Sequence, residues 1–222
     1  MARQAKPAPK RGTLSRERVL HTALRIADEE GIESLSMRRL ASELGVNPMS
    51  LYNHVADKDD LLDGLADLAV GEVAVPSSGE EWKSALRRRA VSVREMLERH
   101  PWASGVIESR INPSPARLRY PESVIGCLRQ AGFSVELAIH AFFTLDSYIY
   151  GFAQQQHNLP ESPPEGLGRV AEMTLAALPP DEYPYLREVI VEHVAKAGFR
   201  YEDAFAFGLD LILDGLEPAG RD

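Results

Sequence analysis

The sequence predicts an all-α protein with a small N-terminal helix-turn-helix domain and a larger C-terminal helical domain. Apolar residues recur at helical spacing from about residue 15 to residue 216. Residues that favour helix starts and stops stand at the ends of these periodic segments. No segment shows the alternation of apolar and polar residues that marks a half-buried strand.

Four helices are predicted in the first third of the chain, over residues 15–30, 37–44, 47–54 and 57–73. Side chains suited to capping precede or open each of them, namely Ser15, Ser36, Asn47 and Asp57. Gly45 follows the second helix and can adopt the left-handed conformation of a tight turn. These helices form a predicted domain at 15–73, whose last helix connects it to the rest of the chain.

The remaining helices form a predicted domain over residues 80–218, after a short Pro/Ser/Gly break. The first runs from about Trp82 toward Pro101, and the next ends at Gly132 and starts or kinks at Pro121. The last four are expected at 134–156, 166–177, 181–197 and 201–216. Residues 1–14 carry four basic residues and no apolar periodicity, and are predicted to form a flexible arm.

Charge is divided unevenly along the chain. Residues 1–58 carry a net charge of +3, whereas residues 59–222 carry −11. This asymmetry favours a protein that presents one end to a polyanion, although a basic tail on an acidic protein gives the same pattern. The single cysteine, the lack of an apolar run long enough to span a membrane and the lack of a secretory signal predict a cytoplasmic location.

The segment 36–54 has the spacing of a helix-turn-helix. Leu40, Leu44, Val46 and Leu51 are spaced to fill the wedge between two crossing helices, which leaves the other side of the second helix facing outward. Amide and hydroxyl groups on that side can read base edges, a methionine can contact a thymine methyl, and basic residues nearby can contact phosphates. The predicted DNA-binding residues are Arg38, Asn47, Pro48, Met49, Ser50, Tyr52, Asn53, His54 and Lys58.

The segments 31–41, 44–46, 51–55 and 58–62 resemble the DNA-binding domain of TetR-type repressors. In that family the tyrosine and histidine of the LY-x-H segment and the lysine four residues on contact operator DNA, which implies those roles for Tyr52, His54 and Lys58. The resemblance implies a transcriptional regulator, most simply a ligand-responsive repressor. An activator of the same fold, or a helical interaction protein without DNA binding, are the alternatives.

The C-terminal part resembles the tetracycline-repressor branch of the family, most clearly over residues 205–217. The resemblance implies a homodimer in which helix 134–156 and the last helix pack against their symmetry mates. The last helix supports this independently, because it is apolar along two sides and so needs two partners, although a helix fully buried in a monomer has the same pattern. A two-fold dimer predicts a palindromic double-stranded operator, with the two reading helices roughly 34 Å apart.

A small-molecule effector site is expected among the helices between residues 82 and 156, where aromatic residues surround a few polar ones. Core packing is the better explanation for any single aromatic, but a carboxylate on an apolar helix needs a partner, a ligand or solvent. The candidate ligand-binding residues are His100, Trp102, Glu108, Phe142, Asp146, Tyr148 and Gln155.

Catalytic and metal sites are not predicted. The chain has no nucleophile elbow and no Walker loop, and its six histidines are scattered without metal-ligand spacing. Where tetracycline repressors hold a drug-bound magnesium with a histidine and a glutamate, rough alignment places Glu108 and Gln155. We therefore expect no catalytic residues, no metal and no cofactor other than the effector.

Overall fold

The computed structural model describes residues 14–77, 79–110, 114–159, 165–179, 182–194 and 200–216. These residues are helical or form turns and loops, with no β-strand among them, so the all-α prediction is confirmed. They divide into two compact units, the boundary falling after Ala66. The predicted arm at 1–14 lies almost wholly outside the described residues.

The first unit contains α1 (Arg16–Glu30), a 3-10 turn (Ile32–Ser34), α2 (Met37–Leu44), α3 (Pro48–Leu51) and the first part of α4 (Lys58–Gly71). The hydroxyls of Ser15 and Ser36 cap α1 and α2 by accepting hydrogen bonds from the backbone N–H three residues on. Gly45 has φ 67°, the left-handed conformation that allows α2 to end in a tight turn.

The core of this unit comes from one face of each helix, as helical periodicity predicts. Its fully or almost fully buried apolar residues are Val19, Ala23, Ile26, Ala27, Leu35, Leu40, Ala41, Leu44, Leu51, Val55, Leu61, Leu65 and Ala66. Of the residues predicted to fill the wedge of the helix-turn-helix, Leu40, Leu44 and Leu51 are buried and Val46 is half-buried. The geometry of this small unit is therefore fixed by apolar packing from several helices.

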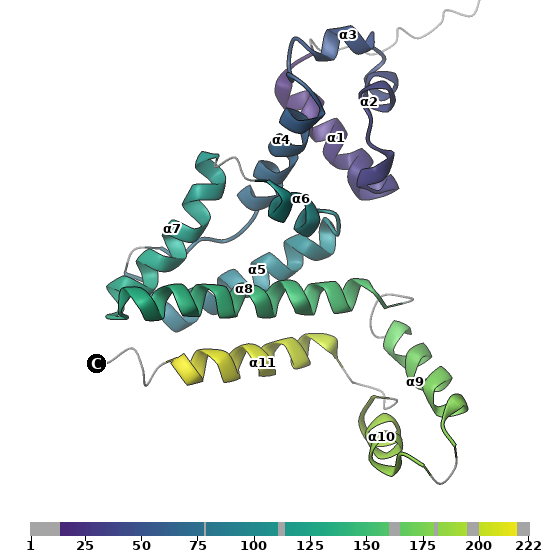
Figure 1. Ribbon diagram of the computed structural model, residues 1–222, viewed down its shortest axis with the longest axis vertical. Helices are drawn as coiled ribbons and strands as arrows, with labels where there is room; N and C mark the ends of the chain where they lie inside the picture. The colour runs from purple at the N-terminus through teal and green to yellow at the C-terminus, as the bar shows by residue number, and fades with distance from the viewer. Residues whose placement is uncertain are drawn as a thin grey trace, which may run out of the picture. The chain divides into compact units, whose positions relative to one another are not determined.

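The second unit contains the end of α4 and seven further α-helices among the described residues. They are α5 (Trp82–Arg99), α6 (Ala103–Ser109), α7 (Pro115–Gln130), α8 (Val135–His157), α9 (Glu165–Ala177), α10 (Pro184–Val189) and α11 (Tyr201–Leu216). A short π-helical segment, Ile190–Val194, follows α10. Helices α5, α7 and α8 pack on one another, and α11 lies along α8 and also contacts α5 (Figure 1).

Three helices differ from the sequence-based expectation, and one of them, α6, was not predicted at all. Helix α7 begins at Pro115, which occupies its first turn behind the Ser114 cap, and continues through Pro121 rather than starting there. Helix α3 has regular α-helical geometry only from Pro48 to Leu51, and residues 52–54 form a turn. The turn is held to the helix by backbone hydrogen bonds from His54 N–H and Val55 N–H to the Leu51 carbonyl.

The core of the second unit is built from the facing sides of α5, α7, α8 and α11. Its buried residues include Leu86, Ala90, Val93, Leu97, Val124, Leu128, Ala138, Ala141, Leu145, Ile149, Phe205, Leu209 and Leu213. None of the helices in the described part of the chain is both long and apolar enough to cross a membrane.

Candidate nucleic-acid interface and small-molecule site

Helix α3 and the turn after it present an exposed surface over a buried anchor. Leu51 is fully buried, whereas Met49 is 70% exposed and Tyr52 is 45% exposed. Pro48 and Asn53 are also exposed, and Ser50 and His54 are half-buried. One side of this segment is thus fixed in the core while the opposite side is open to a partner.

Asn47 starts the exposed segment and fixes its direction. Its side-chain oxygen accepts a hydrogen bond of 2.9 Å from the Met49 N–H, and Pro48 occupies the first helical position. The Asn47 carbonyl oxygen is therefore used within the helix start, so its amide N–H groups are the part free to face a nucleic acid.

Arg16 holds the far end of the same segment. Its guanidinium donates to the His54 carbonyl at 2.9 Å and pairs with the Asp60 carboxylate at 2.6 Å. The hydrogen bond from Arg16 lowers the pKa of Asp60, which also accepts a hydrogen bond of 2.8 Å from the Ala56 N–H. The start of α1, the turn after α3 and the start of α4 are joined at one point.

The basic side chains of α2 and the start of α4 differ in whether they are exposed or already paired with a carboxylate. Arg39 is occupied by Glu30 at 2.6 Å and Glu43 at 2.7 Å, and so binds α2 to α1. Its neighbour Arg38 is exposed, as is Lys58 at the first position of α4. Arg38 and Lys58 are thus the predicted phosphate-contacting cations that reach solvent.

The candidate ligand-binding residues lie in different parts of the second unit. His100 is buried, with its Nε2 atom 3.1 Å from a carboxylate oxygen of Glu72, and its ring centroid lies 5.7 Å from that of Trp102. Glu108 and Gln155 are exposed on α6 and α8. These four candidates do not form a single cluster with a common polar partner.

Tyr148 faces α11. Its hydroxyl donates a hydrogen bond of 2.8 Å to the Phe205 carbonyl, and the two rings stack with centroids 5.4 Å apart. A methyl group at Gly208 would lie 2.8 Å from the Tyr148 ring, so the glycine permits this close approach. The contact gives Tyr148 a structural role in joining α8 to α11.

Asp146 and Phe142 are brought together with a residue that sequence reasoning missed, Arg89 of α5. The Arg89 side chain is 1% exposed, and its Nη2 atom donates to the Asp146 carboxylate and to the Tyr120 hydroxyl. Its guanidinium lies 4.4 Å from the centroid of the Tyr120 ring and 5.9 Å from that of Phe142. We call Arg89, Tyr120, Phe142 and Asp146 the arginine cluster.

Charge states in the arginine cluster follow from burial. Burial alone would lower the pKa of Arg89. Tyr120 and Asp146 have the opposite and larger effect, so the pKa of Arg89 lies above its ordinary value and the guanidinium stays charged. Burial also raises the pKa of Tyr120 and of the nearby Tyr150. Both tyrosine hydroxyls therefore remain neutral hydrogen-bonding groups at neutral pH.

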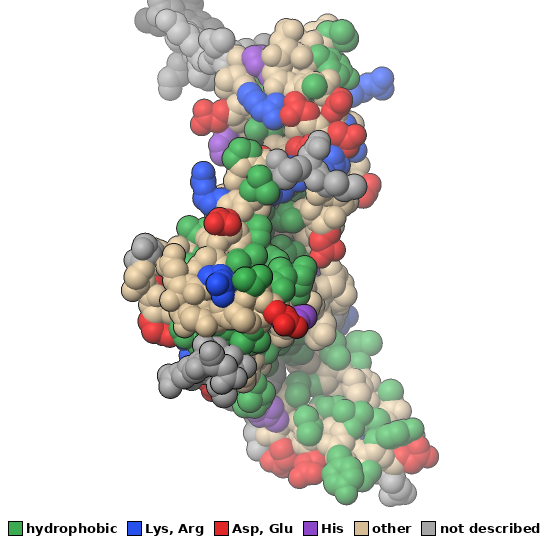
Figure 2. Space-filling view, turned by 60° about the vertical axis from the view of Figure 1, so that its left-hand side comes forward, with side chains coloured by type: hydrophobic (Ala, Val, Ile, Leu, Met, Phe, Trp, Pro, Cys, Tyr) green, Lys and Arg blue, Asp and Glu red, His purple; other side chains and the backbone are tan. Residues whose placement is uncertain are grey.

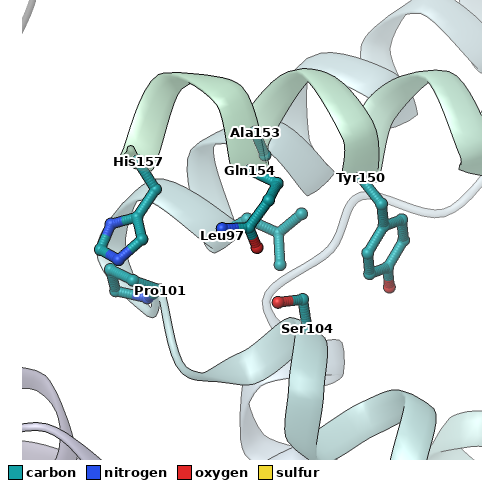
Figure 3. Close-up of a pocket in the computed structure, with 7 residues that line it drawn as sticks. All are labelled: Leu97, Pro101, Ser104, Tyr150, Ala153, Gln154 and His157. Atoms are coloured by element: carbon teal, nitrogen blue, oxygen red, sulfur yellow. The ribbon is translucent and has the colours of Figure 1, made fainter. Parts of the chain in front are cut away.

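A small hollow, partly open to solvent, lies between α5, α6 and α8 (Figure 3). Its lining residues are Leu97, Pro101, Ser104, Tyr150, Ala153, Gln154 and His157. Tyr150 stands at the end of the hollow opposite Pro101 and His157. Burial raises the pKa of Tyr150 most, and the charges of Asp146 and Arg89 also act on it, so this lining residue lies within electrostatic range of the arginine cluster.

Apolar side chains also face outward from the second unit. On α11, Phe207 is 67% exposed and Leu211 is 61% exposed, while Phe143 on α8 is 60% exposed. Figure 2 shows further hydrophobic side chains over α9 and α10, where Met173 and Tyr185 are 63% and 81% exposed. Exposed apolar area of this kind on a helical unit indicates a surface that a partner covers.

Two family models match the chain. The model described as bacterial regulatory proteins, tetR family, matches residues 19–65, and the model described as tetracyclin repressor-like, C-terminal domain, matches residues 75–219. Between them they span most of the residues that form both units.

Similar proteins include transcriptional repressors. The HTH-type transcriptional repressor DrrR1 of Streptomyces coeruleorubidus is 35% identical, over 94% of this chain and 80% of that protein. The tetracycline repressor protein class D of Escherichia coli is 31% identical, over 92% of this chain and 89% of that protein. The crystal structure of the TetR family protein ActR of Streptomyces coelicolor in complex with actinorhodin has a TM-score of 0.75 and 29% identity, covering 95% of this chain and all of that one.

Proposed function

The chain belongs to the TetR family of bacterial regulatory proteins, and from that membership and the geometry of its first unit we propose that it is a repressor. As a member of the family it is a DNA-binding transcriptional regulator that responds to a small molecule. The proposal is that it occupies a palindromic operator as a dimer in the cytoplasm and leaves the operator when an effector binds.

The exposed side of α3 over a buried Leu51 is the observation that carries the DNA-binding assignment. We assign base contacts to Met49, Ser50 and Asn53, because a methyl group, a hydroxyl and an amide can each read a major-groove edge. Phosphate contacts fall to Tyr52, His54, Lys58 and Arg38. Pro48 and Asn47 set the start of the reading helix.

Helices α8 and α11 are the proposed dimer surface. The exposed residues of α11 form a row on one side of the helix, Ala204, Phe207, Leu211 and Gly215, opposite the buried row that packs on α8. On α8, Phe143, Ser147 and Gly151 are exposed along one side. Small residues beside large apolar ones allow helices of two protomers to pack closely.

The effector site is proposed at the hollow between α5, α6 and α8 together with the arginine cluster. Apolar walls with a few fixed polar groups are typical of small-molecule sites. ActR, which has the same fold, is known in complexes with actinorhodin and with (S)-DNPA, so a small-molecule site within this fold has precedent. Of the candidate residues, Asp146 and Phe142 belong to this site.

Selection of operator DNA from a random pool, followed by a binding assay with the selected sequence, tests the proposal. A palindromic consensus is expected, and Tyr52→Ala should weaken binding by about tenfold while leaving the dimer intact. Tyr183→Ala, which removes an equally exposed tyrosine from the second unit, is the matched control. A pool that yields no consensus, or unchanged binding by Tyr52→Ala, contradicts the assignment.

A further inference from the structure

The arginine cluster contains more hydrogen-bond donors than acceptors. A guanidinium has five N–H bonds, two of them on Nη2. In Arg89 the Nη2 atom is occupied by Asp146 and Tyr120, but the Nε and Nη1 atoms have no hydrogen-bond partner within the described part of the chain. The Arg89 side chain is 1% exposed, and the edge of its guanidinium formed by Nε and Nη1 therefore has no acceptor among the described residues.

Buried polar groups in folded proteins are almost always hydrogen-bonded, so such an edge indicates a binding partner. Tyr120 cannot supply it, because its hydroxyl already lies at Nη2 and itself donates to Asp146 over 3.2 Å. Asp146 reaches the guanidinium through a single carboxylate oxygen, Oδ1. The remaining donors are therefore set for an acceptor that the described part of the chain does not supply.

The surroundings of the open edge restrict what this acceptor can be. The rings of Tyr120 and Phe142 meet edge to face, with centroids 6.2 Å apart, beside the guanidinium. Tyr150, which lines the hollow, adds a third half-buried ring. A cationic ligand would be repelled by Arg89, whereas a planar ring with an oxygen anion satisfies both the walls and the donors.

We infer that Arg89 is the recognition residue for an aromatic effector that carries an oxyanion, such as a carboxylate or an ionised phenol. The inference rests on the proposed effector site and adds the chemical class of its ligand. The oxyanion accepts hydrogen bonds from Nε and Nη1, while Asp146 keeps Nη2 in place. The aromatic part lies against Tyr120 and Phe142 and extends past Tyr150 into the hollow.

A matched pair of probes tests the charge requirement. 2-Naphthoate and 2-naphthamide share a ring system and a carbonyl oxygen, but only the first carries an anion. Titration calorimetry on the full-length protein should show binding of 2-naphthoate at least about tenfold tighter than that of 2-naphthamide. Equal affinities, or no binding of 2-naphthoate at about 10 mM, would overturn the inference.

Variants at position 89 then test whether Arg89 causes the preference for the anion. Arg89→Met should abolish the preference for the anion, and Arg89→Lys should keep part of it, because lysine retains the charge but not the fork. Arg88→Met removes the adjacent arginine, which pairs with Glu80 on the surface, and should leave the preference unchanged. If Arg89→Met does not fold because Asp146 is left buried without its partner, Arg89→Met with Asp146→Asn removes both charges and tests the same point.

Operator binding separates this inference from the proposed function. Arg89→Met should bind operator DNA as the unmodified protein does, since Arg89 lies outside the DNA-binding unit. Failure of the unmodified protein to bind any selected operator would count against the proposed function and would leave the preference for 2-naphthoate as a separate result. A preference for 2-naphthoate that persists in Arg89→Met would overturn the role of Arg89 alone.

Discussion

Asp67 and Arg117 form an ion pair in which the Arg117 Nε atom lies 3.1 Å from the Asp67 carboxylate. The Ser114 hydroxyl donates to the same carboxylate oxygen over 2.6 Å. Asp67 belongs to the last part of α4, and Arg117 stands one helical turn before Tyr120 on α7. Helix α7 therefore contributes Tyr120 to the arginine cluster and also, through Arg117 and Ser114, binds Asp67 near the end of α4.

This arrangement predicts that Asp67→Asn uncouples the effector from DNA binding. A displacement of α7 on effector binding reaches α4 through Asp67, so the variant should retain operator affinity but need about tenfold more effector for release. Release of labelled operator during effector titration measures the effect. Arg119→Ala, an exposed cation on the same helix, is the control, and an unchanged release curve for Asp67→Asn would exclude this route.

Acid should weaken the DNA-binding unit through Asp60. The Arg16 hydrogen bond lowers the pKa of Asp60 in the folded state, so the folded protein binds this proton less readily than the unfolded chain does. The resulting stabilisation is present above the ordinary pKa of 3.8 and is lost as the pH falls through the lowered value.

Replacing the partner tests this pH dependence. Arg16→Ala should lower the melting temperature at pH 7 and should reduce the further loss between pH 5 and pH 2, because less of the interaction remains to be lost. Thermal unfolding followed by circular dichroism at several pH values provides the measurement. A melting curve that falls with acid equally steeply in the unmodified protein and in Arg16→Ala would show that other carboxyls dominate.

Capping made the N-terminal helices predictable to within a few residues. Ser15, Ser36, Asn47 and Gly45 each specify a boundary by a local interaction that depends on nearby sequence alone. A signal of the same kind was overlooked at α7. Its start was expected at Pro121, or a kink there, although the Ser114 cap and Pro115 mark a start six residues before Pro121.

The arginine cluster was predicted only in part, because it depends on contacts between helices. Asp146 and Phe142 were identified from their positions on an apolar helix, but their partner Arg89 was not. Its position offered a signal, since Arg89 lies three residues after Leu86 and four before Val93 on the buried side of α5. That Tyr120 joins the cluster follows from the packing of α7 on α5 and α8, which no local pattern specifies.

Lys58 is predicted to contribute to DNA binding through charge alone. It is exposed at the start of α4, where a phosphate contact would be independent of base sequence. Lys58→Ala should weaken binding to operator and to random DNA by similar factors, and should reduce the slope of log affinity against log salt by about 1. Binding measured at four or five salt concentrations gives the slope, and Lys83→Ala in the second unit, where Lys83 pairs with Asp214, is the control. An unchanged slope for Lys58→Ala would show that Lys58 makes no contact with a phosphate.

Leu211 provides the sharpest test of the dimer surface. It is 61% exposed on α11 and lies opposite the buried row of Phe205, Leu209 and Leu213, so a charge there leaves the protomer core intact. In a dimer that covers this row, Leu211→Asp would bury two unpaired carboxylates across the two-fold axis, and should raise the dissociation constant by about a hundredfold or more. Analytical ultracentrifugation should then find monomers with unchanged helix content.

The same variant separates dimerisation from DNA reading. Because each reader alone contacts half of a palindrome, Leu211→Asp should lose affinity for the full operator while its weak binding to an isolated half-site stays unchanged. Leu118→Asp places the same charge at an exposed leucine of α7 and should remain dimeric. A Leu211→Asp protein that stays dimeric would exclude this side of α11 and direct attention to the exposed apolar residues of α9 and α10, where Met173→Asp is the corresponding variant.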